Sequence, residues 1–241
     1  MFKGFQNTSR GFNGIPNLNF QMNNQAYGFS GCTFWLDAAY GLNTQTDLAE
    51  VSSWQTKIGN ATYIQTTVAN QPRFIKNDVN FNNYPSVEFT TSGKNLTLPN
   101  SNYITLGFTI LCVVKYDSLV AANSIMRRAD NGGGLYIGGT SAGYEGPTWR
   151  SPINGGVQIT SNADSSNPAI CVFTPERIYL NGSQTNTGTA TGFNTGISTI
   201  GSSDVNSLYG RLCEVVAFGY VMTTSQIESL SANINLKYAI Y

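Results

Sequence analysis

A chain of 241 residues can bury a sizeable core, and sandwiches of about 200 to 250 residues commonly fold as one domain. Charged residues make up only 11% of the chain, the formal net charge is zero and histidine is absent, which excludes a basic footprint for nucleic acid. No apolar run approaches the roughly 18 residues of a membrane-spanning helix, and Met1 to Ser30 lack a compact secretion signal, so we expect no membrane partner and a start in the cytoplasm.

The first predicted segment is an extended N-terminal arm over residues 1–30, rich in Asn, Gln, Gly and Phe. No helix or strand period runs through it, and so polar a stretch buries too little area to order itself. Its phenylalanines recur at intervals, at Phe2, Phe5, Phe12 and Phe20, which suits docking into grooves on another chain. We expect a partner-docking arm and a homo-oligomer. Two alternatives stay open: a flexible N-terminal segment without a partner, or an arm that packs on its own domain.

Short β-like runs bounded by turn residues then follow one another, which predicts a sandwich domain over residues 31–241. The candidate strands are Cys32 to Leu36, Ala61 to Thr66, Ser86 to Phe89, Phe108 to Lys115, Leu135 to Ile137, Val157 to Thr160, Ala169 to Phe173, Arg177 to Leu180, Ser198 to Ile200 and Arg211 to Tyr220. Asn181 and Gly182 supply the positive φ angles of a type I′ turn, so we expect an exposed hairpin there. Helix-rich crossovers are missing, which argues against a parallel sheet.

Two segments have a helical pattern. Asp47 to Trp54 is a brief one, a short helix or turn. Near the C-terminus, Thr223 is suited to be an N-cap, with Gln226 three residues on. One helical face then carries Ile227, Leu230, Ile234 and Tyr238. We therefore expect one amphipathic helix that lies against the sandwich and closes the chain.

The four cysteines, Cys32, Cys112, Cys171 and Cys213, are widely spaced and form no CxxC pair. Three of them lie inside apolar runs, where an isolated cysteine behaves as a small hydrophobic residue. We expect buried free thiols, with a disulfide as the alternative.

Several segments, in order, resemble the laminin-G-like, concanavalin-type jelly roll found in phage structural proteins and in bacterial surface proteins. They are Trp35-Leu-Asp-Ala38, Val51-Ser-Ser-Trp54, Gly59-Asn60-Ala61, Gln71-Pro72, Pro85 to Phe89, Phe108 to Val114, and Gly210 to Phe218 followed by Thr224 to Glu228 and Leu236 to Tyr238. The likeness runs from about Cys32 to Tyr241. In the turn that leads to Gly59-Asn60, Lys57 and Ile58 depart from the Asp and Ser often seen in the family. It implies an all-β, two-sheet antiparallel jelly-roll sandwich with one C-terminal helix. The extended N-terminal arm has no counterpart in this resemblance, and we expect it to precede the sandwich.

Each matched feature also has a structural interpretation, which we favour. Trp35 and Trp54 are large apolar side chains suited to fill the sandwich. Asp37 is suited to hold a loop by accepting backbone hydrogen bonds.

Catalytic chemistry finds little support in the sequence. A glycosidase needs two carboxylates a fixed distance apart, and the Glu-x-Asp-x-x-Glu pattern of the related glucanases is absent. Glu88 and Glu214 each lack a second carboxylate two positions away, although a partner from another strand stays open. Without histidine, a Ser-His-Asp triad, a Cys-His pair and imidazole metal ligands are excluded. We therefore expect no enzymatic activity.

Cofactors are likewise not expected. No Asp-x-Asp-x-Asp-Gly loop occurs, and calcium binding would need a combination of the loop acids Asp117, Asp130, Asp164 and Asp204. The run Asn131 to Gly134 lacks the helix and lysine of a phosphate loop, so it predicts a flexible hairpin loop.

One stretch has the composition of a ligand-binding loop. Tyr144, Trp149 and Arg150 place aromatic rings and a charge close together, and sugars bind by stacking on such rings while polar groups fix their hydroxyls. We expect a lectin-like patch there; burial of Trp149 in the core is the alternative.

From the resemblance and the missing catalytic acids, the first expectation is a non-catalytic phage virion structural protein: a capsid decoration, head-fibre or tail-associated module. Such a protein would be assembled in the host cytoplasm, reside in the virion and contact other virion proteins through its arm. A carbohydrate-binding, lectin-like adhesin for host surface glycans is the second expectation. A glycan hydrolase with dispersed carboxylates is the third.

Overall fold

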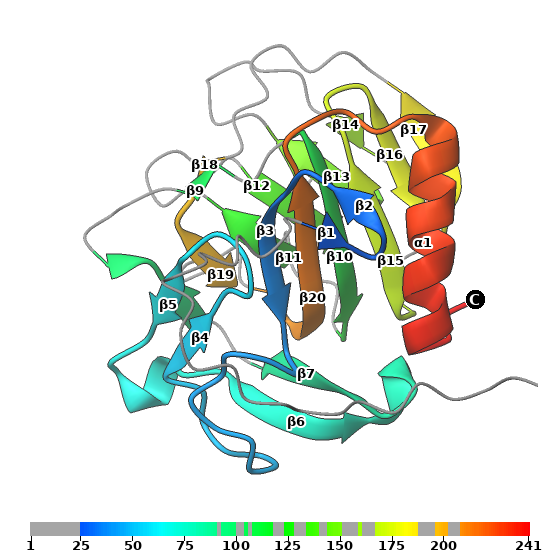
Figure 1. Cartoon of the computed structure of the whole chain (residues 1–241). Helices are drawn as coiled ribbons and strands as arrows, with labels where there is room; N and C mark the ends of the chain where they lie inside the picture. Colours follow the sequence, from blue (N-terminus) through cyan, green and yellow to red (C-terminus); the bar gives the residue numbers. More distant parts are fainter. Residues whose placement is uncertain are drawn as a thin grey trace, which may run out of the picture.

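The computed structural model describes residues 25–90, 93–99, 104–105, 108–117, 123–127, 134–139, 144–150, 159–160, 167–187, 196–201 and 208–241. Within these residues, two eight-stranded antiparallel sheets stack face to face, and one helix lies at the C-terminal end (Figure 1). The predicted all-β antiparallel sandwich with a single C-terminal helix is confirmed.

The first sheet has the strand order β17-β16-β15-β10-β20-β7-β6, and β3 also pairs with β20. Its strands are β3 (Cys32–Asp37), β6 (Arg73–Asp78), β7 (Tyr84–Phe89), β10 (Thr109–Tyr116), β15 (Ala169–Phe173), β16 (Arg177–Leu180), β17 (Ser183–Thr187) and β20 (Gly210–Phe218). Strand β20 pairs with β7 along residues 210–212 and with β3 along residues 214–218, so one long strand carries two neighbours on the same side.

The second sheet has the order β14-β13-β12-β11-β19-β8-β5-β4. Its strands are β4 (Ser53–Gln55), β5 (Thr62–Ile64), β8 (Asn95–Thr97), β11 (Asn123–Arg127), β12 (Gly134–Gly139), β13 (Tyr144–Arg150), β14 (Ile159–Thr160) and β19 (Thr199–Gly201). Two small strand pairs join β1 (Gln25–Ala26) to β2 (Phe29–Ser30), and β9 (Ile104–Thr105) to β18 (Gly196–Ile197). Two 3-10 turns, η1 (Val68–Asn70) and η2 (Val79–Phe81), and the helix α1 (Thr224–Tyr238) complete the described elements.

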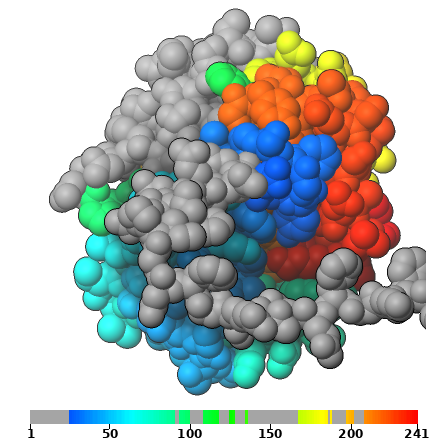
Figure 2. Space-filling view, viewed as in Figure 1, coloured from blue at the N-terminus to red at the C-terminus, as the bar shows by residue number. Residues whose placement is uncertain are grey.

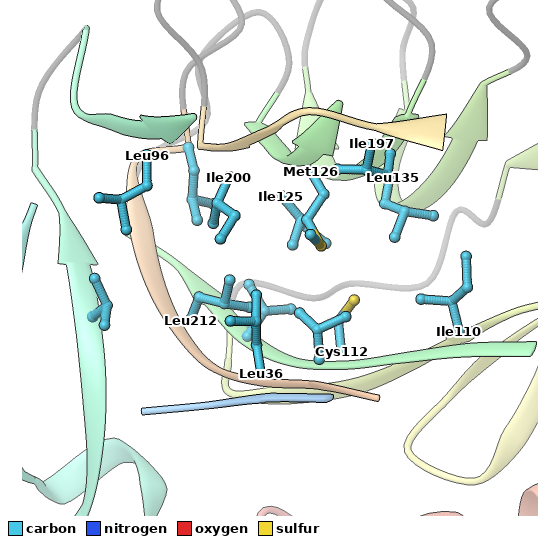
Figure 3. Packing of buried hydrophobic residues seen from close by; sticks show 14 of the residues in the cluster. Leu36, Leu96, Ile110, Cys112, Ile125, Met126, Leu135, Ile197, Ile200 and Leu212 are labelled. Carbon is cyan, nitrogen blue, oxygen red and sulfur yellow. The ribbon is translucent and has the colours of Figure 1, made fainter. Parts of the chain in front are cut away.

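The main core lies between the two sheets, where apolar side chains of both meet (Figure 3). Strand β10 shows why this sheet is apolar on both faces: Ile110 and Cys112 point into the sandwich, whereas Leu111 and Val113 belong to a second cluster on the outer face. Successive side chains of a strand alternate between faces, so a continuous apolar run buries both. The outer face must therefore be covered as well.

Helix α1 provides that cover. Ile227, Leu230, Ile234 and Tyr238 are buried in the outer cluster with side chains of β10, β15 and β20. The helix begins as predicted, because the Thr223 side chain accepts the Gln226 backbone N–H and the Gln226 side chain accepts the N–H of Thr223. No helix of the described residues has the length and apolarity needed to cross a bilayer.

All ten candidate strands occur, and β15 and β16 match their expected bounds to the residue. For Asp47 to Trp54 the helix alternative is wrong, whereas the turn alternative holds at Asp47 and Leu48. The Leu48 and Val51 amides donate to Phe74 and Pro72 at 2.8 Å, and Trp54 belongs to β4. Eight residues gain too little from intrahelical bonds to nucleate a helix, so pairing with the neighbouring chain prevails.

The hairpin after β16 has the predicted turn, since Asn181 and Gly182 have φ angles of 52° and 78°. Its expected exposure is wrong for the first strand. Ile178 packs into the main core and Tyr179 into the outer cluster. Neighbours on both faces of the sheet bury β16, and a hairpin turn in the sequence carries no information about them.

The four cysteines are free and buried, as expected. Burial raises the pKa of the Cys32 thiol to about 11, which keeps it protonated and unreactive at neutral pH. The predicted glycine loop starts at Asn131, and its residues 131–133 lie outside the described residues. The described chain resumes at Gly134, where β12 begins.

Candidate functional site

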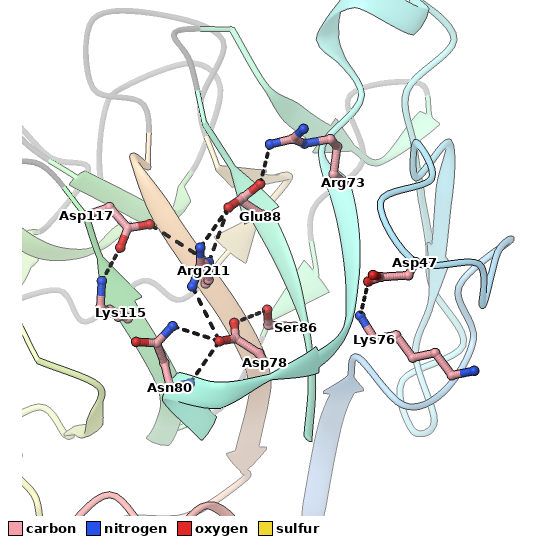
Figure 4. Close-up of polar contacts among 10 residues, drawn as sticks. All are labelled: Asp47, Arg73, Lys76, Asp78, Asn80, Ser86, Glu88, Lys115, Asp117 and Arg211. Atoms are coloured by element: carbon pink, nitrogen blue, oxygen red, sulfur yellow. Dashed lines mark hydrogen bonds and ion pairs between the residues drawn. The ribbon is translucent and has the colours of Figure 1, made fainter. Parts of the chain in front are cut away.

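Charged side chains form a row across the first sheet (Figure 4). The strand register places Arg73 of β6, Glu88 of β7 and Arg211 of β20 directly opposite one another. Arg73 donates to Glu88 at 2.6 Å, and Arg211 donates to the other Glu88 oxygen at 3.0 Å. Alternating charges in a cross-strand row stabilise the pairing of the three strands.

A second carboxylate, Asp78, completes this row. One Asp78 oxygen accepts Ser86 Oγ at 2.6 Å, and the other accepts the Asn80 amide at 3.0 Å and lies 3.4 Å from Arg211. Glycoside hydrolysis needs one carboxylic acid and one carboxylate that both face a sugar. The carboxylate oxygens of Asp78 and Glu88 instead accept hydrogen bonds from protein donors, so this network suits a structural role.

A second polar cluster lies on the outer face of the same sheet, where Glu214 of β20 is fully buried. Its carboxylate accepts the hydroxyl of Tyr27 at 2.7 Å and the indole N–H of Trp35 at 2.6 Å. From α1 it accepts the Tyr238 hydroxyl at 2.6 Å and the Lys237 ammonium at 3.0 Å. A buried carboxylate is stable only with such partners, so Glu214 ties the β1–β2 hairpin, β3 and the helix together.

The electrostatics of this cluster follow from burial. Burial, followed by the nearby charge of Glu214, raises the pKa of the Tyr27 and Tyr238 hydroxyls well above their ordinary value. Burial alone would lower the pKa of Lys237, but the charges of Glu214 and Asp37 outweigh it and raise that pKa. Asp37 stands opposite Glu214 in the register and lies 3.5 Å from the Lys237 ammonium. Glu214 thus has a neighbouring carboxylate on another strand, an alternative that the sequence left open.

Three aromatic side chains and one lysine lie beside this buried cluster. We call these residues the Trp35 patch; they are Tyr27, Trp35, Tyr40 and Lys57. The rings of Tyr27 and Trp35 are 5.7 Å apart, and the Lys57 ammonium lies 3.9 Å from the Trp35 ring centre. The same ammonium is 5.8 Å from the ring of Tyr40, which is 46% exposed. Figure 2 shows the surface of residues 25–40 in blue, against the orange and red C-terminal segment.

Trp35 and Trp54 have different roles. Trp54 is fully buried in the main core, as expected. Trp35 is only partly buried and lies on the outer face, so the expectation that it fills the sandwich is wrong. Strand alternation explains this, because Phe34 and Leu36 take the inward positions of β3. Asp37 accepts the Ala39 amide at 2.9 Å, which confirms its predicted loop role.

The predicted sugar-binding residues Tyr144, Trp149 and Arg150 lie on strand β13, where a loop was expected. The register pairs Trp149 with Leu135 and Ile159, and Arg150 with Gly134. Only the backbone of this strand is described, so a shared patch of the three side chains stays a prediction.

The four arm residues Phe2, Phe5, Phe12 and Phe20 lie outside the described residues. The described chain starts with the β1–β2 hairpin, in which Ala26 is buried in the outer cluster. The Asn233 side chain of α1 donates to the Tyr27 carbonyl at 3.3 Å. Residues 25–30 therefore pack against the sandwich and its helix.

Among the described residues, no group of three or more His, Cys, Asp or Glu side chains is arranged to hold a metal ion. Asp117, one of the four acids considered for calcium, forms an ion pair with Lys115. Asp130, Asp164 and Asp204 lie outside the described residues, so calcium binding stays untested.

Comparisons with known proteins give similarity at the level of the fold. No family model matches the chain, and no curated protein matches it. A Trypanosoma rangeli sialidase in complex with 2,3-difluorosialic acid superposes with a TM-score of 0.53 and 14% identity, over 83% of this chain and 32% of the sialidase. Domain 4 of a GH43 extracellular arabinanase from Geobacillus stearothermophilus, in complex with arabinotriose, has a TM-score of 0.43 and 14% identity, over 66% of this chain and 81% of that domain. The chain thus spans about a third of the sialidase.

These comparisons contradict the expected role as a phage virion structural protein. A structure that superposes with a TM-score of 0.53 is part of a sialidase, which gives the virion role no support. The error has a physical origin, because one sandwich fold serves many unrelated functions and matched strands specify the fold alone. Both similar proteins are enzymes by name, but 14% identity transfers no catalytic role. The expected lack of activity stays a prediction.

Proposed function

We propose that this domain binds carbohydrate at the Trp35 patch. The observation that supports it is that the rings of Trp35 and Tyr40 lie beside one ammonium group, with the partly exposed Tyr27 ring against Trp35. Sugars bind proteins by placing an apolar ring face on an aromatic side chain while nearby polar groups hold their hydroxyls. Tyr40 supplies an exposed ring, and Lys57 supplies the donors.

The rigidity of the patch favours binding. Glu214 holds both the indole N–H of Trp35 and the hydroxyl of Tyr27, so these rings are fixed before a ligand arrives. Tyr27 also has a φ of 54°, which a bulky residue adopts at a cost and which the surrounding contacts maintain. Preorganised rings lose little conformational entropy on binding.

We propose binding without hydrolysis. The two carboxylates nearest the patch, Asp37 and Glu214, are at most 7% exposed and accept bonds from lysine, tyrosine and tryptophan. A hydrolase would need carboxyl groups that reach the glycosidic bond. Incubation with polysaccharides should therefore produce no new reducing ends.

The direct test is a glycan array followed by calorimetry with the full chain. Tyr40→Ala should weaken binding by about tenfold, which corresponds to one stacking interaction of about 1.4 kcal/mol. Tyr241→Ala is the matched control, because Tyr241 is a comparably exposed tyrosine, 54% exposed, at the end of the chain. An array without signal for the wild type would contradict the proposal.

Trp149→Ala separates this site from the one predicted on β13. If Tyr144, Trp149 and Arg150 form the sugar site, Trp149→Ala abolishes binding and Tyr40→Ala leaves it intact. The Trp35 patch predicts the reverse order of effects.

A further inference from the structure

Lys57 has unused hydrogen-bonding capacity at the surface. Its side chain is 31% exposed, and its ammonium donates to Asp37 at 3.3 Å while it lies over the Trp35 ring. An ammonium carries three N–H donors. Among the described residues, Asp37 is its hydrogen-bond acceptor, so two donors remain for a ligand.

The charges around the patch are layered by depth. Two cations, Lys57 and Lys237, balance two anions, Asp37 and Glu214, so the local sum is zero. The anions are buried, with side chains 7% and 0% exposed, whereas Lys57 is 31% exposed. A ligand that approaches from solvent meets the Lys57 ammonium first, and the buried carboxylates lie behind it. The outward field at the patch is therefore positive although the cluster is neutral.

Asp37 does not depend on Lys57 alone. The Asp37 oxygen that faces Lys57 also lies 3.5 Å from the Lys237 ammonium, and the other oxygen accepts the Ala39 amide. If Lys57 turns partly towards a ligand, Asp37 keeps two partners. The cost of recruiting Lys57 is correspondingly small.

From this arrangement we propose that the glycan bound at the Trp35 patch is acidic, with its carboxylate paired to the Lys57 ammonium and a sugar ring stacked on Tyr40. The proposal rests on carbohydrate binding at this patch and specifies the class of ligand. Lys57 is its specificity-determining residue, because it supplies a charge-assisted hydrogen bond that a neutral sugar cannot form.

The test compares matched acidic and neutral glycans on the full chain by calorimetry. An array that contains acidic glycans beside their neutral counterparts is screened first. Calorimetry then compares sialyllactose with lactose, and an oligogalacturonate with its methyl ester. We expect the acidic member to bind at least about tenfold more tightly at low salt, as a charged hydrogen bond allows. The difference should shrink as ionic strength rises.

Lys57→Met keeps the length and apolar stem of the side chain and removes its charge. It should bring the affinity for the acidic glycan close to that for its neutral counterpart. Lys57→Arg should retain the preference, which distinguishes loss of charge from local unfolding. Lys76→Met is the control, since Lys76 is an exposed lysine on β6, outside the patch.

The outcomes separate this inference from the proposed function. Equal binding of acidic and neutral glycans, or an acidic preference that survives Lys57→Met, would overturn the inference and leave carbohydrate binding standing. Absence of binding to every glycan would overturn both.

Discussion

Replacing Glu214 by alanine tests the central electrostatic argument. The change removes the one acceptor shared by Tyr27, Trp35, Tyr238 and Lys237, which come from three separate elements. The hydroxyl of Tyr238 and the ammonium of Lys237 would then lie in a largely buried site without their main partner. Losing one member of a buried ion pair leaves the other charge uncompensated, which is the costly case.

The expected loss is about 3 to 5 kcal/mol in the free energy of unfolding, the range for breaking a buried pair. Lys237 retains Asp37 at 3.5 Å and is 19% exposed, which favours the lower end of that range. A loss of about 3 kcal/mol lowers the melting temperature of a domain of this size by about 6 to 12 °C. Tyr238→Phe, which removes one hydroxyl and keeps the ring, should cost only about 1 kcal/mol.

Urea unfolding followed by tryptophan fluorescence measures both variants, and amide hydrogen exchange of residues 25–30 reports on the hairpin. Glu214→Ala should accelerate exchange there, because the Tyr27 hydroxyl loses its acceptor. A loss below about 1 kcal/mol, similar to that of Tyr238→Phe, would mean that water replaces the carboxylate. The cluster would then not hold the hairpin and helix together.

Three other predictions concern stability. The raised pKa of Lys237 stabilises the fold fully below the ordinary lysine pKa of about 10.4, so stability should fall as pH rises through the folded pKa, and Lys237→Met should remove this part of the pH profile. Leu48 is 58% exposed with a φ of 61°, and Leu48→Asn should raise the unfolding free energy by about 0.5 to 1 kcal/mol in urea titrations, because asparagine tolerates this conformation. Gly210→Ala places a Cβ against the Lys115 carbonyl oxygen, far inside van der Waals contact, and should cost about 3 kcal/mol or more, or prevent soluble expression. A flat alkaline profile, a destabilised Leu48→Asn or a fully stable Gly210→Ala would contradict the respective argument.

Local patterns in the sequence sufficed for much of the fold. The run from Ile110 to Val114 predicts a strand buried on both faces, and the strand β10 has that property. Thr223 and Gln226 predict the start of α1, and the positive φ angles at Asn181 and Gly182 follow from residue type alone. These features depend on neighbours within a few positions, which one sequence contains in full.

Strand β13 shows where local patterns fail. Its segment contains Gly146 and Pro147, which lower strand propensity, and a loop was expected there. Among the described residues, Pro147 stands opposite Ile137 of β12, and β14 pairs with Thr148 and Trp149. Pairing with β12 on one side and with β14 on the other makes this segment a strand, and the residues of the segment itself do not predict that pairing.

At the candidate site, the sequence around Glu214 likewise predicts only part of the structure. A carboxylate at the centre of the apolar run Leu212 to Val216 signals that buried partners must exist, because an isolated buried charge is too costly. The partners themselves lie 24 positions away at Tyr238 and 187 positions away at Tyr27, beyond any local pattern. Once formed, these bonds act on more than stability. A slip of β3 by one residue against β20 would turn Trp35 away from Glu214, so the cost of an unsatisfied carboxylate opposes that slip. The buried charge thus fixes the register that brings Trp35 to the surface beside Tyr27, and the proposed binding patch depends on it.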